Sequence, residues 1–171
     1  MSYKITIDDQ VFDLNREDIQ ALDLIGRKTL RDGGEGVKDL LTELAGELTA
    51  LRDVNPTLVD SYLAAIHGCG ETAKTIFAQF QSDAHYVGSV AFNMLMQYGT
   101  VVAGALLAKA GLIAQQKLND GSDEPFYRQK VATANFYKAQ ILPRASAYQA
   151  AVMAGHSEVT ALGEEDFDII A

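Results

Sequence analysis

The sequence has few of the residues that hold small or secreted folds together. It contains one cysteine, Cys69, and no tryptophan among 171 residues. A single cysteine cannot form a disulfide within the chain, so the fold must rest on a hydrophobic core, which a chain of this length can bury without a covalent staple. A lack of disulfides suits a reducing compartment. We therefore expect a cytoplasmic protein.

Basic residues are also scarce. The chain has 14 Lys and Arg against 23 Asp and Glu, which gives a formal net charge of −9. Such a field repels phosphate backbones and anionic lipids, so we expect neither nucleic acid nor a membrane as partner. The N-terminus lacks the apolar run of a signal peptide. The longest apolar stretch, residues 101–112, contains Lys109 and is too short to cross a bilayer.

Only three prolines occur, and each predicts a helix boundary or a kink. Pro56 and Pro125 stand where helices should begin, because proline fits the first helical turn. Pro143 lies inside the last predicted helix, residues 125–154. Since proline removes one backbone hydrogen bond and clashes with the carbonyl four residues back, we expect a kink at about residues 139–143.

Between these boundaries, apolar residues recur at helical spacing. The clearest stripe has spacings of four, three, four and three, at Val37, Leu41, Leu44, Leu48 and Leu51. A further helix should follow Pro56, and another, rich in small residues, should span about residues 83–118. The pattern predicts an all-α fold, an up-and-down bundle of four to five helices over residues 15–157.

The two ends of the chain differ from this pattern. Tyr3, Ile5 and Ile7 alternate with polar residues, which predicts a β-strand or a short β-hairpin in residues 1–14. A lone hairpin is marginal in water, so it must pack on the helices or pair with another chain. Residues 158–171 form an acidic tail.

Two motifs could carry chemistry. Residues 68–75 nearly fit a phosphate-binding loop, but Ala73 replaces its second glycine and helical periodicity precedes it. His67, Cys69, Glu71 and His85 have no recognised zinc spacing. We interpret both groups as coincidences within helices. We predict no catalytic, cofactor-binding or metal-binding residue.

The segment from residue 125 to residue 157 contains no acid but several bases and tyrosines. Two interpretations remain: a solvated helix face whose charges balance the acidic tail, which we favour, or a partner surface, since tyrosine and arginine are enriched at interfaces. The candidate partner contacts are Tyr127, Arg128, Lys130, Tyr137, Lys138 and Arg144.

Two blocks carry a family resemblance. Residues 19–34, IQALDLIGRKTLRDGG, and residues 126–137, FYRQKVATANFY, resemble the C-terminal end of the larger bacterial members of the acyl-CoA dehydrogenase family. In that family a glutamate just before the first block is the catalytic base in many members. Here Leu14 stands at that place, so the resemblance implies a helical bundle that associates, without dehydrogenase activity of its own.

Three functions fit these observations. The first is a non-catalytic helical domain that self-associates, as a homodimer, or binds a protein partner. The second is an accessory chain of a flavin-dependent acyl-CoA dehydrogenase in bacterial fatty-acid metabolism. FAD would then be present only if a partner chain supplied the catalytic core. The third is a module that binds acyl chains or acyl-CoA in a groove between helices.

Overall fold

The computed structural model describes residues 3–7, 10–14, 20–29, 32–80, 83–163 and 166. Strands β1 (Tyr3–Ile7) and β2 (Gln10–Leu14) pair antiparallel, with Ile5 opposite Phe12. The helical elements follow in the order η1 (Asp23–Thr29, a π-helix), α2 (Glu35–Thr49), α3 (Pro56–Phe80), α4 (Ala84–Asn119), α5 (Pro125–Gln140) and α6 (Arg144–Ala154).

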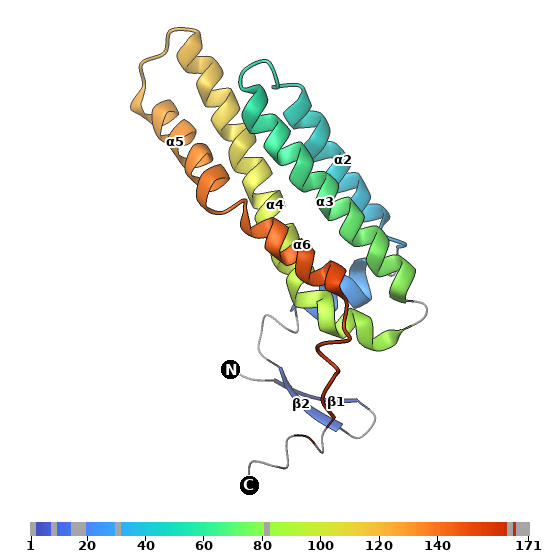
Figure 1. The fold of residues 1–171 in the computed structure, drawn as a ribbon. Coiled ribbons are helices and arrows are strands. Elements are labelled where there is room, and N and C mark those ends of the chain that lie inside the picture. The colour runs from blue at the N-terminus through green and yellow to red at the C-terminus, as the bar shows by residue number, and fades with distance from the viewer. Residues whose placement is uncertain are drawn as a thin grey trace.

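The long helices form an up-and-down bundle. Figure 1 shows α2, α3, α4 and the α5–α6 pair running side by side, with the chain turning back at alternate ends. Helix α4 is the hub, because α2, α3, α5, α6 and η1 all contact it. The predicted all-α bundle is confirmed for this part of the chain. The expected helix of about residues 83–118 is α4, within one residue at each end.

The core lies where the predicted stripes meet. Leu41, Leu44 and Leu48 of α2 are buried, and so are Tyr62 of α3 and Met94 of α4. Helix α4 is long and apolar enough to cross a membrane by length and composition, but half of its most apolar window is buried inside the protein. That burial is what a central helix of a bundle requires.

The chain between β2 and α2 is α-helical only over a short stretch. Its α-helical part covers residues 20–22 and then widens into η1. Ala21, Ile25 and Thr29 are buried at successive spacings of four. These three residues therefore face the core of the bundle across the α-helical and the π-helical part. Residues 15–19 and 30 lie outside the described part of the chain.

Pro143 ends a helix instead of kinking it. Helix α5 stops at Gln140 and α6 begins at Arg144, so the expected continuous helix is wrong, although the position of the disturbance is right. The carbonyl of Tyr137 accepts from both Ile141 and Leu142, at 2.9 Å each, which closes α5. Pro143 has no N–H with which to continue the ladder, and α6 restarts beyond it.

Close approach of α4 and α5 generates a first prediction. A Cβ added at Gly111 would lie 2.5 Å from the Cβ of Ala134. Because Ala134 has no rotamer that could yield, Gly111→Ala should push the helices apart. Overpacking costs about 1–3 kcal/mol, more than the gain of up to about 1 kcal/mol from replacing glycine in a helix. We expect a lower midpoint of thermal unfolding by circular dichroism.

The matched control is Gly88→Ala on the same helix. Nothing lies within 4 Å of a Cβ added there, so this variant should unfold at the wild-type temperature or above it. Equal midpoints for the two variants would contradict the tight α4–α5 contact.

Candidate functional site

The predicted contact residues at the start of α5 serve local structure. Arg128 is exposed, and its Nη1 donates to the carbonyl of Asp123 at 2.6 Å. The Lys130 ammonium lies 5.3 Å from the ring centroid of Phe126, at cation–π distance. Tyr127 is partly buried and packs edge-on against the same ring, with centroids 5.6 Å apart. These contacts hold the beginning of α5 together.

The other three residues surround the break between α5 and α6. The Tyr137 hydroxyl donates to the carbonyl of Thr100 on α4 at 3.0 Å, so this tyrosine is a structural tie. Lys138 lines a cavity next to the break, and Arg144 is exposed at the first position of α6. A partner-contact role for the six residues stays a prediction.

The most unusual surface is a stripe on α4, which sequence reasoning noticed only as a run of small residues. Its members follow spacings of four and three and are exposed or partly exposed: Phe92, Met96, Gly99, Ala103, Leu106, Ala110 and Ile113. We call this set the α4 stripe. Phe92 is 41%, Leu106 52% and Ile113 43% exposed. The sequence pattern that could have revealed the stripe is a second set of apolar residues at helical spacing, on a helix whose other apolar face is buried in the core.

No charged residue belongs to the α4 stripe, whereas the exposed faces of other helices carry charges. Helix α2, for example, exposes Asp39 and Glu43. A continuous apolar strip on a solvent-exposed helix is typical of an interaction site. The stripe is therefore the best candidate for a docking surface in this part of the chain.

The phosphate-loop-like segment, residues 68–75, lies within α3. The Thr72 hydroxyl donates to the carbonyl of Gly68 at 2.9 Å, and Lys74 pairs with Glu71 at 2.8 Å. The Lys74 hydrogen bond lowers the pKa of Glu71. The helical interpretation of this motif is confirmed, because a helix interior has no free N–H groups with which to cradle a phosphate.

The four residues considered above as metal ligands, His67, Cys69, Glu71 and His85, do not form a site among the described side chains. His67 is exposed and lies 3.8 Å from Glu71, while Cys69 is fully buried. The side chain of His85 lies outside the description. Within the described residues, no group of three or more His, Cys, Asp or Glu is placed to hold a metal ion.

Comparison with known proteins gives the family. The sequence model described as acetyl-CoA dehydrogenase C-terminal like matches residues 40–163, most of the chain. The chain belongs to this family. The match begins within α2 and continues past the end of α6. It includes the second resembling block, residues 126–137, while the first block, residues 19–34, precedes it.

Two curated relatives are dehydrogenases. The 3-methylmercaptopropionyl-CoA dehydrogenase of Ruegeria pomeroyi is 33% identical over 153 residues, which cover 85% of this chain and 24% of that protein. The butyryl-CoA dehydrogenase of Syntrophomonas wolfei is 31% identical over 132 residues, covering 73% of this chain and 21% of that protein. The chain thus spans less than a quarter of the length of these relatives.

The position that the resemblance equates with the catalytic base is at the end of β2. Leu14 is the last residue of that strand, and its side chain lies outside the description, as do residues 15–19. The lack of a catalytic base at this position stays a prediction from the resemblance. It rests on the identity of Leu14, because a leucine side chain cannot abstract a proton.

The reactivity of the Cys69 thiol can be predicted from its burial. Burial raises the pKa of its thiol to about 12. At pH 8 only about one molecule in ten thousand would then carry the reactive thiolate. We expect the native protein to react very slowly with Ellman's reagent, and the guanidinium-unfolded protein to release one equivalent at once. Rapid stoichiometric reaction of the native protein would show that Cys69 is an accessible nucleophile.

Proposed function

We propose that this acetyl-CoA dehydrogenase C-terminal-like bundle is a non-catalytic interaction module that self-associates as a homodimer through the α4 stripe. The observation that carries the proposal is an apolar strip without charges on the outer face of the central helix. Exposed apolar strips of this kind are uncommon on monomers. Closed two-fold symmetry is the commonest way to cover one.

Electrostatic repulsion favours a dimer contact at the α4 stripe over a contact at the charged faces. The chain has a net charge of −9, so most faces of two copies repel each other. Two uncharged stripes can approach without that cost. Gly99 and Ala103 at the middle of the stripe leave room for close helix contact, and Leu106 can fill the space beside them on the opposite copy. The edges of β1 and β2 are a second candidate contact.

The relatives support a role beside a dehydrogenase. Both are dehydrogenases of acyl-CoA thioesters by name, and this chain corresponds to a minor part of each. We propose that flavin binding and acyl-CoA oxidation belong to a catalytic core outside the present domain. The domain itself would bind no cofactor and would act in bacterial cytoplasmic fatty-acid metabolism as an association element of that core.

Leu106→Glu tests the α4 stripe. In the proposed dimer this change would bury carboxylates of like charge against an apolar surface, and such juxtapositions cost several kcal/mol. We expect the wild-type chain to scatter light at twice its mass of 18.5 kDa. The variant should scatter as a monomer, with a dimer dissociation constant raised at least about tenfold.

The control variant is Leu40→Glu, since Leu40 is 42% exposed on α2 and lies outside the stripe. It should remain dimeric. A wild-type monomer at high micromolar concentration would refute the proposal, and loss of the dimer only on deleting residues 1–14 would move the contact to the strands.

A second candidate function rests on a groove between α2 and α3. This groove has a volume of about 830 Å³, and its lining is mostly apolar, including Leu41, Ile66 and Phe77. Two lysines, Lys38 and Lys74, line it together with one acid, Glu35. Lys74 is paired with Glu71, so Lys38 is the cation that this lining offers beside Glu35, and an apolar channel with a lysine in its wall suits an acyl chain that ends in an anion. The acyl-CoA substrates named for the relatives make this chemistry relevant.

Octanoate titrated by calorimetry tests this groove. Ala73→Phe should fill it and abolish binding, because Ala73 is a lining residue on α3. Ala132→Phe, at an exposed position of α5, should leave binding unchanged. Binding that survives Ala73→Phe, or no heat at millimolar octanoate, would rule out the acyl-chain function.

A further inference from the structure

The spacing of the α4 stripe is that of a coiled-coil seam. Its members follow one another at alternating intervals of four and three residues from Phe92 to Ile113. Such a repeat averages about 3.5 residues, so the stripe keeps facing a second helix that lies almost along α4. Helices crossed at a steep angle would touch only part of it. The stripe therefore fits a helix that lies along α4 over its whole length.

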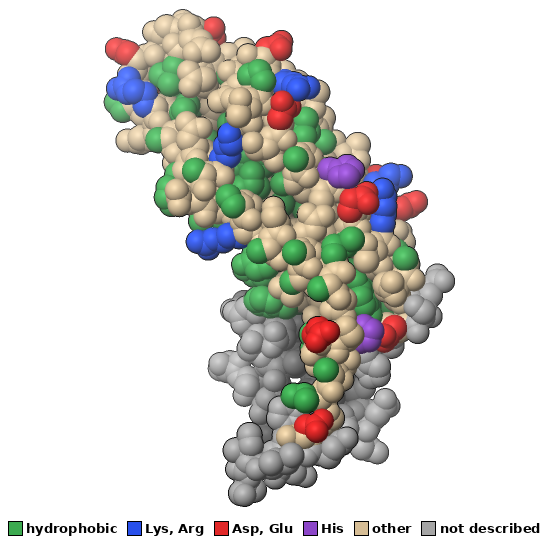
Figure 2. Space-filling view, in the orientation of Figure 1, with side chains coloured by type: hydrophobic (Ala, Val, Ile, Leu, Met, Phe, Trp, Pro, Cys, Tyr) green, Lys and Arg blue, Asp and Glu red, His purple; other side chains and the backbone are tan. Residues whose placement is uncertain are grey.

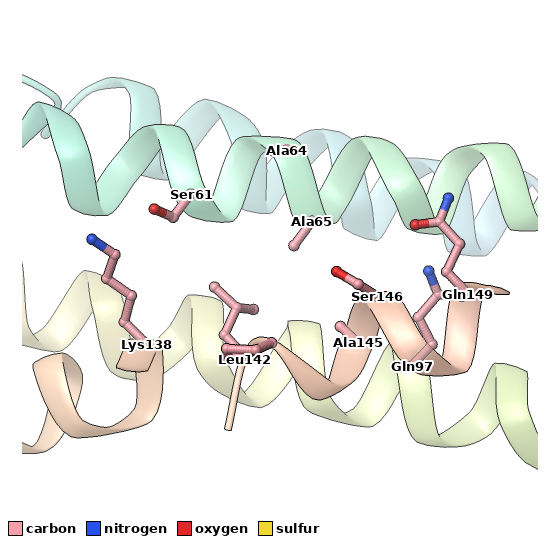
Figure 3. Close-up of a pocket in the computed structure, with 10 residues that line it drawn as sticks. Ser61, Ala64, Ala65, Gln97, Lys138, Leu142, Ala145, Ser146 and Gln149 are labelled. Atoms are coloured by element: carbon pink, nitrogen blue, oxygen red, sulfur yellow. The ribbon is translucent and has the colours of Figure 1, made fainter. Parts of the chain in front are cut away.

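The side of α4 that faces α3 and α6 is occupied within the bundle. Gln97 of α4 is 1% exposed and lines the cavity at the α5–α6 break together with Ser146 and Gln149 of α6. Figure 3 shows these three side chains in the space bounded by α3 and α6. Leu106, in contrast, is 52% exposed in the α4 stripe. A helix that covers the stripe must therefore come from outside the described bundle.

The charge pattern leaves α4 open to a second copy of the chain. Figure 2 shows the face that carries α3 and α6, where acidic, basic and histidine side chains are spread along the bundle. Helix α4 contains no acid between Ala84 and Asn119, and its basic residues are Lys109 and Lys117. Two copies of a chain with a net charge of −9 therefore approach each other with less repulsion along α4 than along the acidic faces.

The residue that follows the stripe favours one direction for the second helix. Lys117 stands four residues after Ile113, at the next position of the seam, and it is exposed. In a parallel pair each seam residue lies opposite its own copy, so two Lys117 ammonium groups would meet and repel each other. In an antiparallel pair the two ends of the seam lie opposite each other, and Lys117 can reach Phe92. A lysine over an aromatic ring is attractive, as the contact between Lys130 and Phe126 of this chain illustrates.

The sizes of the side chains favour the same direction. With Lys117 opposite Phe92, Leu106 of one copy lies opposite Ala103 of the other copy and next to its Gly99. The leucine then fills the notch that the glycine and the alanine leave, and the same contact recurs by symmetry. In a parallel pair the notch at Gly99 and Ala103 would face its own copy and leave a void between the helices.

We propose that, in the homodimer proposed above, on which this arrangement rests, the two α4 helices pack antiparallel about a two-fold axis between Ala103 and Leu106. Leu106 of each copy lies in the notch at Gly99 and Ala103 of the second copy. Lys117 of each copy lies over the ring of Phe92 of the second copy. The stripe is thus complementary to itself in one direction only.

Single cysteines near the two ends of the seam report the direction. In a Cys69→Ala background, Met96→Cys and Ile113→Cys each place one thiol on the stripe. Antiparallel packing brings position 96 of one copy to position 113 of the other, and it keeps identical positions about 25 Å apart at a helical rise of about 1.5 Å per residue. A short bis-maleimide reagent should therefore cross-link a mixture of the two variants into a heterodimer and leave each variant alone uncross-linked. Denaturing gel electrophoresis resolves the products when one variant carries a tag that changes its mass.

Neutralising Lys117 gives an independent readout by sedimentation equilibrium. Lys117→Gln should raise the dimer dissociation constant about two- to fivefold, because it removes the contact with Phe92. In a parallel pair the same change would relieve repulsion and lower that constant. The matched control is Lys74→Gln, which removes the same charge from an exposed position of α3 outside the stripe. It should change the dissociation constant by less than about twofold.

The outcomes separate the antiparallel arrangement from the dimer itself. A wild-type monomer at high micromolar concentration would overturn both. Cross-linking of Met96→Cys or of Ile113→Cys with itself, in variants that keep the mass of a dimer, would overturn the arrangement and leave the dimer intact. A dimeric mixture that forms no heterodimer cross-link would do the same, and so would a tighter dimer of Lys117→Gln.

Discussion

Close packing of α4 against its neighbours determines where the other helices lie. Gly104 and Gly111 face α5, and a Cβ at Gly104 would meet the rings of Tyr62 and Tyr137 at 2.7 Å. Glycine at these two points of one face lets α4 receive aromatic rings at Gly104 and the backbone of α5 about two turns further on, at Gly111. The Tyr137 hydroxyl then ties α5 to the Thr100 carbonyl. Because every other helix packs on α4, this contact fixes the positions of the surfaces and cavities around it.

Burial on the inner faces of α4 leaves its outer face unused. The neighbouring helices of the bundle cover α4 on about three sides. In a soluble monomer, the remaining side of such a helix is normally polar. Here that side stays apolar along the α4 stripe, while acids occupy the exposed faces of α2. In the proposed dimer, stability and association would depend on different faces of one helix, so a charge at Leu106 would affect assembly without disturbing the core.

The break between α5 and α6 at Pro143 leaves a cavity in the bundle. A continuous helix in place of α5 and α6 would pack against α3 and α4 along its whole length. Ending α5 at Gln140 and restarting at Arg144 leaves a hollow beside Leu142 and brings Lys138 and Gln149, from different helices, to the same cavity. Ser61, Gln97 and Ser146 make the lining of that hollow partly polar. The domain therefore has an exposed apolar stripe on α4, an apolar groove between α2 and α3, and a small partly polar cavity, each at a different place in the bundle.

Local pattern determined much of this architecture. The leucine stripe of α2, the prolines at 56 and 125, and Gly155 after α6 fixed helix bounds to within a residue or two, because periodicity and capping act over a few neighbouring residues. The family likeness was also readable in residues 126–137. The π-helix η1, the full break at Pro143 and the presence of Gln97 and Lys138 in the lining of one cavity were decided only by tertiary structure. Each depends on which surfaces lie opposite one another across the bundle, and residues 41 positions apart in the chain carry no local signal that they line the same cavity.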